Sequence, residues 1–220
     1  MKNQKRFTGE ENHSITTSEA VTFIKYYKEH FGADAEPGCF FDKQAVQAIL
    51  DQPNAVGLRY YYGVDELGAT RLILAGTTAE RADLLDGEPL KLSVMHPPTD
   101  ALGRYDSTAV DHAISHGQAA ALTARYRDSM LAGQPKGGFF GKKAVQRLLD
   151  EPECRGLRFF YGANRDGQRV IVIMCTDRYG AEMLHGPKID LSGGCPPFCG
   201  PGNPLNGGVD RSEKRRVVFK

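Results

Sequence analysis

The chain repeats itself at a spacing of 99 residues. Residues 38–63 align without a gap on residues 137–162, and 15 of these 26 positions carry the same amino acid. The match extends further, since Pro97-Pro98 aligns with Pro196-Pro197. Such a repeat predicts two copies of one supersecondary unit. Positions shared by both copies are expected to serve the common fold, and positions that differ are free or specialised in one copy.

A capping box predicts the start of the first helix in each copy. Copy one has Thr16-x-x-Glu19, and copy two has Ser115-x-x-Gln118 at the same place. In this motif the hydroxyl accepts a hydrogen bond from a first-turn N–H while the Glu or Gln side chain reaches back to the cap. A histidine precedes the box in both copies, at His13 and His112. Its presence in both copies predicts a structural hydrogen bond at the helix entry. The alternative for His112 is that it binds a metal ion together with His116.

A second helix and a hairpin complete each unit. Asp42 and Gly141 are the expected N-caps of the second helix, because both residue types are favoured there. Strands are expected over residues 56–62 and 71–75 in copy one and over 155–161 and 170–175 in copy two. We therefore predict an α+β fold, a tandem duplication of an α-α-β-β unit with a pseudo-twofold relation. Since a lone hairpin is marginal, we expect the two hairpins to form one four-stranded antiparallel sheet packed with helices.

The repeat also predicts the organisation of the chain. Residues 1–12 are expected to be a flexible N-terminus, residues 13–105 the first repeat and residues 106–192 the second. Residues 193–220 read as a loop rich in proline, glycine and cysteine followed by a basic tail. Proline and glycine at this density disfavour a helix or a central strand, so this segment is expected to be a loop or an extended tail.

Composition narrows the classes of partner. Charged residues make up 25% of the chain and leave a net charge of +1, which argues against nucleic acid as the main partner. No run approaches the roughly 18 apolar residues of a membrane span, so no membrane partner is expected. The N-terminus lacks an apolar signal segment and the chain has five cysteines, which together indicate a cytoplasmic protein.

Two cysteines lie four residues apart in the C-terminal loop, at Cys195 and Cys199. Zinc would require two further ligands, for which His185 and His96 are the candidates. A disulfide or a redox-active thiol pair is a second alternative. No second Cys or His pair accompanies the motif, so the favoured interpretation is two free cysteines and no cofactor, with zinc as the alternative.

An arginine stands in the middle of the first strand of both hairpins, at Arg59 and Arg158. A guanidinium beside aromatic side chains can clamp an anion or a carboxylate ligand. The candidate ligand-binding residues are therefore these two arginines with Tyr62 and Tyr161 of the same strands. The simpler alternative is an arginine that is exposed or forms a salt bridge, for example to Asp51.

The Gly-Leu-Arg-x-x-Tyr-Gly strands, the apolar return strand and the closing Cys-Pro-Pro-Phe-Cys-Gly resemble a group of uncharacterised bacterial tandem-repeat proteins. The resemblance covers both repeats and the tail. It implies a bacterial, cytosolic protein and brings no established activity or catalytic residues with it.

No set of acid, base and nucleophile stands out from the spacing of the residues. The leading hypothesis is therefore a non-catalytic protein-interaction or assembly module that binds a protein partner or self-associates into a homo-oligomer. A small-ligand or metal-binding module is the second hypothesis, using the two arginines or the Cys195/Cys199 loop. The third is a hydrolase or thiol enzyme with a site between the repeats.

Overall fold

The computed structural model describes residues 6–86, 90–107, 110–190 and 192–208, which form four helices and two antiparallel sheets. The mixed α+β class predicted from the sequence is correct. In chain order the elements are α1 (Thr17–Phe31), β1 (Gly38–Asp42), α2 (Lys43–Leu50), β2 (Gly57–Val64), β3 (Thr70–Thr77), β4 (Asp83–Leu84), β5 (Leu90–Leu92), β6 (Ala113–Ile114), α3 (His116–Ser129), β7 (Gly137–Gly141), α4 (Lys142–Leu149), β8 (Gly156–Ala163), β9 (Arg169–Thr176) and β10 (Lys188–Ile189).

The two hairpins lie in different sheets, so the expected single four-stranded sheet is wrong. Sheet A has the strand order β1-β8-β9-β10, and sheet B has the order β6-β5-β3-β2-β7 with β4 paired to β3. Each hairpin is completed by a strand of the other copy, β1 on β8 and β7 on β2. The two exchanged pairs have the same register, Gly38 opposite Phe160 and Gly137 opposite Tyr61. This reciprocity supports the predicted pseudo-twofold relation, which stays a prediction.

The exchanged strands β1 and β7 are absent from the sequence-based prediction, which places no strand before the second helix of either copy. Both begin with a glycine because the neighbouring backbone passes too close for a side chain. A Cβ on Gly38 would lie 2.2 Å from the Phe159 carbonyl oxygen, and one on Gly137 would lie 2.0 Å from the Tyr60 carbonyl oxygen. Glycine is the residue that allows such an approach of two backbones.

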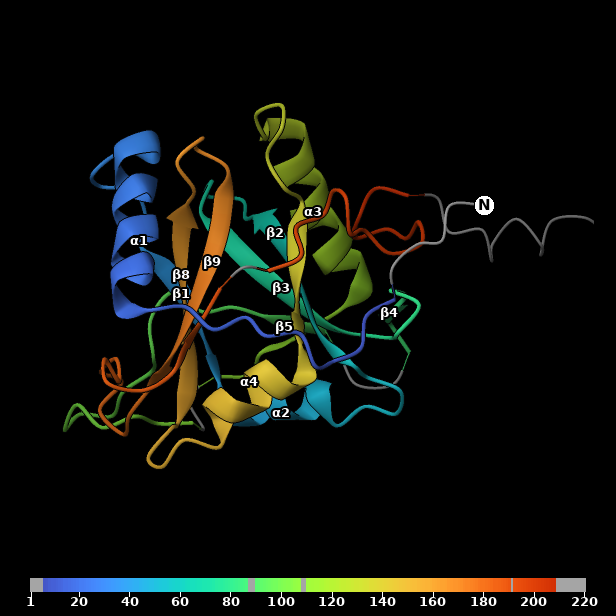
Figure 1. Cartoon of the computed structure of the whole chain (residues 1–220). Helices are drawn as coiled ribbons and strands as arrows, with labels where there is room; N and C mark the ends of the chain where they lie inside the picture. The colour runs from blue at the N-terminus through green and yellow to red at the C-terminus, as the bar shows by residue number, and fades with distance from the viewer. Residues whose placement is uncertain (1–5, 87–89, 108–109, 191, 209–220) are drawn as a thin grey trace, which may run out of the picture.

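The two sheets face each other around the main core, with a helix on each outer face (Figure 1). Leu58 and Tyr60 of sheet B meet Leu157 and Phe159 of sheet A in this core. Helix α1 packs on the outer face of sheet A, and α3 packs on the outer face of sheet B. Helices α2 and α4 lie side by side at one end of the molecule (Figure 1). The core is thus built from both copies at once.

The predicted helix starts are confirmed. Thr16 and Ser115 both form complete capping boxes. Asp42 caps α2 by accepting a hydrogen bond from the Ala45 N–H at 2.6 Å, whereas Gly141 offers no side-chain cap to α4. The paired histidines make structural hydrogen bonds as predicted, but the location differs: each ring Nε2 accepts a backbone N–H at the cap of the other copy's second helix and not at the entry of the first helix. The pairs are Asp42 with His112 at 3.3 Å and Gly141 with His13 at 3.0 Å.

The Pro/Gly-rich segment is docked on the body of the protein as far as Gly208. Leu205 is buried in the core under α3. Lys136 Nζ donates to the Asn206 carbonyl oxygen at 3.0 Å, and Arg127 Nη1 donates to the Leu205 carbonyl oxygen at 2.7 Å. Residues 193–208 therefore form a packed loop, and the predicted basic tail of residues 209–220 lies outside the described residues.

Candidate functional site

The two strand arginines occupy matching places on the outer faces of the two sheets. Arg59 on β2 lies opposite Phe139 and Ala75, while Arg158 on β8 lies opposite Phe40 and Met174. Side chains alternate along a strand, so each arginine points away from the core between the sheets. Both guanidinium groups are removed from water, yet their surroundings differ.

Arg59 is completely enclosed and each of its three nitrogens makes a hydrogen bond. It is 0% exposed. Its Nε lies 3.2 Å from Asp83 Oδ1, its Nη1 donates to the Phe198 carbonyl oxygen at 2.8 Å and its Nη2 to the Arg81 carbonyl oxygen at 3.3 Å. The charge is balanced by the carboxylate and the group is shut off from solvent, so Arg59 is closed to a ligand. Its salt-bridge partner is Asp83, and not the Asp51 considered from the sequence.

Asp83 is held by further donors in the same network. Its Oδ2 accepts from the Tyr61 hydroxyl at 2.5 Å and from Asn203 Nδ2 at 2.7 Å. Burial, with the Asp83 charge beside it, raises the pKa of Tyr61 far above its ordinary value, so the phenol stays protonated and donates. The loop that carries Asn203 is thereby tied to sheet B.

Arg158 has no carboxylate partner among the described residues. It is 5% exposed. Nη1 donates to the Met95 carbonyl oxygen at 2.6 Å and lies 3.5 Å from His96 Nδ1, while the buried Nε has no hydrogen-bond partner. The guanidinium carbon lies 5.7 Å from the centre of the Phe160 ring, which adds a cation–π contact.

The residue that corresponds to Asp83 in the second copy is Glu182. The backbone of Asp83 pairs with Thr77 in an antiparallel β-bridge, and the backbone of Glu182 pairs with Thr176 in the same way. Each residue of the second pair lies 99 positions after its counterpart in the first. The side chain of Glu182 is exposed and makes no ion pair with Arg158. One of the two groups that donate to the Asp83 carboxylate is also missing from copy two. Phe160 stands in the place of Tyr61 and has no hydroxyl.

A second buried cation lies on the same face of sheet A. Lys188 on β10 and Arg158 on β8 flank Met174 of β9 in the same register row. Lys188 Nζ donates to the carbonyl oxygens of Leu184 at 2.6 Å and Gly186 at 3.0 Å. Neither cation makes an ion pair with a carboxylate among the described residues, so two buried positive charges lie in one row of this face.

The candidate tyrosines do not join the arginines in one site. Tyr62 and Tyr161 lie on the opposite faces of β2 and β8, buried in the core between the sheets. The Tyr62 hydroxyl donates to the Val170 carbonyl oxygen at 3.5 Å, and the Tyr161 hydroxyl donates to the Thr70 carbonyl oxygen at 3.1 Å. Both hydrogen bonds run from one sheet to the other. Burial raises the pKa of both well above the ordinary value. They join the two sheets and are closed to a ligand at Arg158.

The residues considered for zinc are dispersed. Cys195 and Cys199 form a disulfide, with Cα atoms 4.6 Å apart, and are not the two free cysteines favoured from the sequence. His96 contacts Arg158, and His185 is exposed. Across the described part of the chain, no three His, Cys, Asp or Glu side chains are grouped to hold a metal ion. Zinc stays a prediction that would require the disulfide to be reduced.

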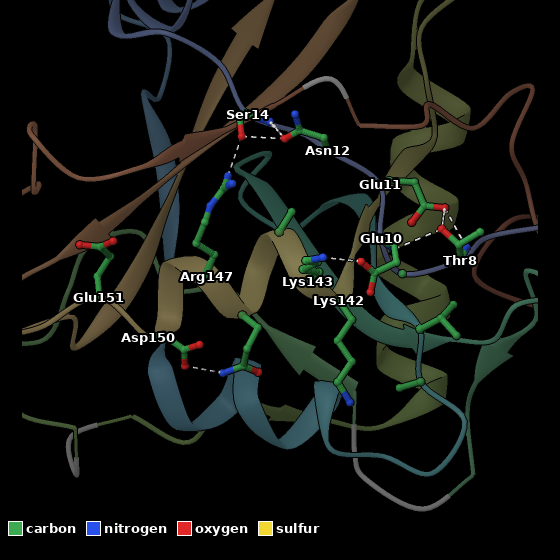
Figure 2. A pocket seen from close by; sticks show the side chains of 15 residues that line it. Thr8, Glu10, Glu11, Asn12, Ser14, Lys142, Lys143, Arg147, Asp150 and Glu151 are labelled. Carbon is green, nitrogen blue, oxygen red and sulfur yellow. Dashed lines mark hydrogen bonds and ion pairs between the residues drawn. The ribbon is translucent and has the colours of Figure 1, made fainter.

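A cleft of about 880 Å³ lies between the N-terminal arm (residues 6–14) and α4 (Figure 2). Its walls carry charges of both signs, and an ion pair and a hydrogen bond link them. Lys143 Nζ lies 2.6 Å from Glu10 Oε2, and Arg147 Nη2 donates to Ser14 Oγ at 2.7 Å. Burial raises the pKa of Glu11, but hydrogen bonds from Thr8 outweigh it and hold that pKa below the ordinary value, so Glu11 is ionised.

Sequence reasoning missed the buried pair Arg59–Asp83. The signal available was the 99-residue shift, which aligns Asp83 with Glu182 and so gives both copies an acidic residue at one position. What the alignment could not supply is the loop of residues 198–206, which closes over Arg59 alone.

Comparisons of the chain with protein families, curated proteins and solved structures each return no match. Within the described ranges, no helix combines the length and the apolar character needed to cross a membrane.

Proposed function

We propose that the chain is a non-catalytic binding module that holds an anionic group of a small ligand at Arg158. The observation that carries the proposal is a buried guanidinium that has no carboxylate partner among the described residues and whose Nε makes no hydrogen bond. A buried charge is costly unless it is paired, and a lost partner typically costs about 3–5 kcal/mol. An anion at this position would supply the missing partner.

The chemistry at Arg158 suits recognition. A guanidinium stays protonated in proteins, so it cannot exchange a proton with a substrate as a general acid or base. It binds carboxylates and phosphates through parallel N–H groups instead. Phe160 and the 95–98 segment beside it offer an aromatic ring and a backbone carbonyl group, which favour ligand binding over bond cleavage.

The test compares anion binding by the native protein and by an Arg158→Gln variant. The Nε–H signal of Arg158 in a nitrogen-correlated NMR spectrum, assigned by its loss in the variant, should shift on titration with simple carboxylate or phosphate salts. Arg125→Gln is the matched control. Arg125 lies on α3 and makes an exposed ion pair with Glu66, so the change removes one positive charge from the surface. If none of these anions changes the chemical shift of the Arg158 Nε–H in the native protein, the proposal is contradicted.

A protein-interaction module is the second candidate function, and the cleft between the arm and α4 is the observation that favours it. Lys143 and Arg147 are specific to copy two, because the matching positions in α2 are Gln44 and Ala48. These extra cations face the acidic arm across the cleft (Figure 2). A charged segment of a partner chain could compete for these contacts. A native mass spectrum of the untagged protein tests the self-association form of this proposal, since a bare 24.1 kDa monomer would count against it.

A further inference from the structure

We infer that the ligand group at Arg158 is a carboxylate, and that the Glu182 side chain competes with it for the guanidinium. This inference rests on the proposed function. In copy one the equivalent guanidinium is occupied by a carboxylate of the chain itself, whereas in copy two the Arg158 Nε has no hydrogen-bond acceptor among the described residues.

Copy one shows what satisfies a guanidinium at this place in the fold. The anion there is a carboxylate, and it is the side chain of Asp83 on Arg59. It lies on the Nε side of the guanidinium, while Nη1 is used by a backbone carbonyl group. Arg158 repeats half of this arrangement, because its Nη1 donates to the Met95 carbonyl oxygen and its Nε lacks an acceptor. The missing half is a carboxylate on the Nε side.

The edge of the Arg158 guanidinium that carries Nε and Nη2 fits the two oxygens of a carboxylate better than the four oxygens of a phosphate. Nε and Nη2 point the same way from a planar group and match the two oxygens of a carboxylate. A phosphate would bring further charged oxygens that need their own donors. The neighbouring polar group fixed on Nη1 is a carbonyl oxygen, which is itself an acceptor. The buried Lys188 is also occupied, since its Nζ donates to two carbonyl oxygens.

Glu182 is the built-in competitor. It bridges Thr176 as Asp83 bridges Thr77, so both carboxylates start from equivalent backbone positions. Glu182 is one methylene longer and is exposed, and it has no equivalent of the Tyr61 hydroxyl to hold it against the arginine. Its side chain can therefore exchange between solvent and the guanidinium. A ligand carboxylate must displace whatever fraction of Glu182 is bound.

The experiment measures the dissociation constants of acetate, propionate and benzoate, and of inorganic phosphate and sulfate at matched ionic strength, by isothermal titration calorimetry, and follows the Arg158 Nε–H signal in every chain that keeps Arg158. The variants are Glu182→Gln, Arg158→Lys and Glu153→Gln. The last is the matched control, since it removes an equal charge from an exposed residue that contacts Arg155. Circular dichroism and a melting curve establish that each variant is folded.

We expect the monocarboxylates to bind and Arg158→Lys to lose the binding, because an ammonium keeps the charge and lacks the planar edge. Glu182→Gln should tighten the dissociation constant about two- to tenfold, the change produced when a competing state occupied about half to nine-tenths of the time is removed. Glu153→Gln should leave it unchanged.

The possible failures separate the two proposals. If phosphate or sulfate binds as tightly as the carboxylates and still requires Arg158, the anion-binding function stands and the carboxylate class is wrong. If Glu182→Gln behaves like Glu153→Gln, Glu182 is not a competitor. If no anion moves the Arg158 signal in the native chain or in Glu182→Gln, the proposed function itself fails.

Discussion

The buried pair Arg59–Asp83 gives the sharpest prediction for stability. Changing Asp83→Asn keeps the size of the side chain and removes its charge, so the Arg59 guanidinium stays 0% exposed without a counter-charge. Removing one partner of a buried ion pair typically costs about 3–5 kcal/mol. Asparagine can still accept a hydrogen bond, so we expect a loss near the lower end, about 3 kcal/mol in the free energy of unfolding.

Urea unfolding followed by circular dichroism measures this loss. For a chain of this size about 3 kcal/mol corresponds to a fall of roughly 6–12 °C in melting temperature. Glu182→Gln is the matched control, because it makes the same chemical change at the equivalent position of copy two. Its side chain is exposed, and losing a contact with Arg158 that is made about half to nine-tenths of the time costs about 0.4–1.4 kcal/mol, so its cost should stay below about half that of Asp83→Asn.

Equal effects of the two variants would refute the reasoning, because of the two carboxylates Asp83 alone makes a buried ion pair. A double variant Arg59→Met/Asp83→Leu gives a second check. It removes both charges, so it should be less destabilised than the sum of its two single variants.

Three further predictions concern the helix caps and the C-terminal loop. Burial raises the pKa of Asp42, but the adjacent His112 ring and the hydrogen bond from the Ala45 N–H outweigh it and lower that pKa below its ordinary value near 3.8. The stabilisation is therefore complete above that value and is lost as the pH falls through the lower folded value, so Asp42→Asn should flatten the acid side of the stability curve in urea titrations. Gly141→Asp should not give α4 the cap of α2. A Cβ there would lie 2.8 Å from Glu11 Oε2 and 3.0 Å from the Gly9 carbonyl oxygen, so we expect a loss of about 1–3 kcal/mol by urea unfolding where a free site would gain. Alkylation of the unreduced, denatured protein should modify only Cys39, Cys154 and Cys175, whereas five modified cysteines in the intact mass would disprove the Cys195–Cys199 bond.

Local signals predicted the elements well because their causes lie within a few residues. The capping box of Thr16 and Glu19 closes over three residues, and its hydrogen bonds form as the sequence indicates. The hairpins likewise follow from alternating strands and turn residues. The exchange of β1 and β7 could not be predicted in this way. Gly38 pairs with Phe160, and no periodicity within one copy reports such a distant contact.

The same limit applies to the candidate site. The residues around Arg59 and Arg158 are alike over a window of several positions, so sequence reasoning predicts the same kind of site at both arginines. Their difference comes from a partner 24 residues away for Arg59 and from a loop 139 residues away. The grouping with Tyr62 and Tyr161 fails for a local reason, since strand alternation places them on the other face.

The C-terminal loop explains why the two copies diverge at this position. Phe198 and Asn203 both contact the network around Arg59, through a carbonyl oxygen and a side-chain amide. The position that matches Asn203 in copy one is Arg104, which is engaged with Asp100 in an exposed ion pair. Copy two therefore provides a loop that covers the arginine of copy one and also holds its carboxylate, whereas copy one covers Arg158 with Met95 and His96 and its described residues supply no donor to Glu182. Grafting the arrangement around Arg59 onto copy two would require more than Glu182→Asp, because the donor that orients Asp83 lies in the C-terminal loop. Deleting residues 193–208 should for the same reason expose Arg59 and weaken sheet B while leaving the contacts of Arg158 intact.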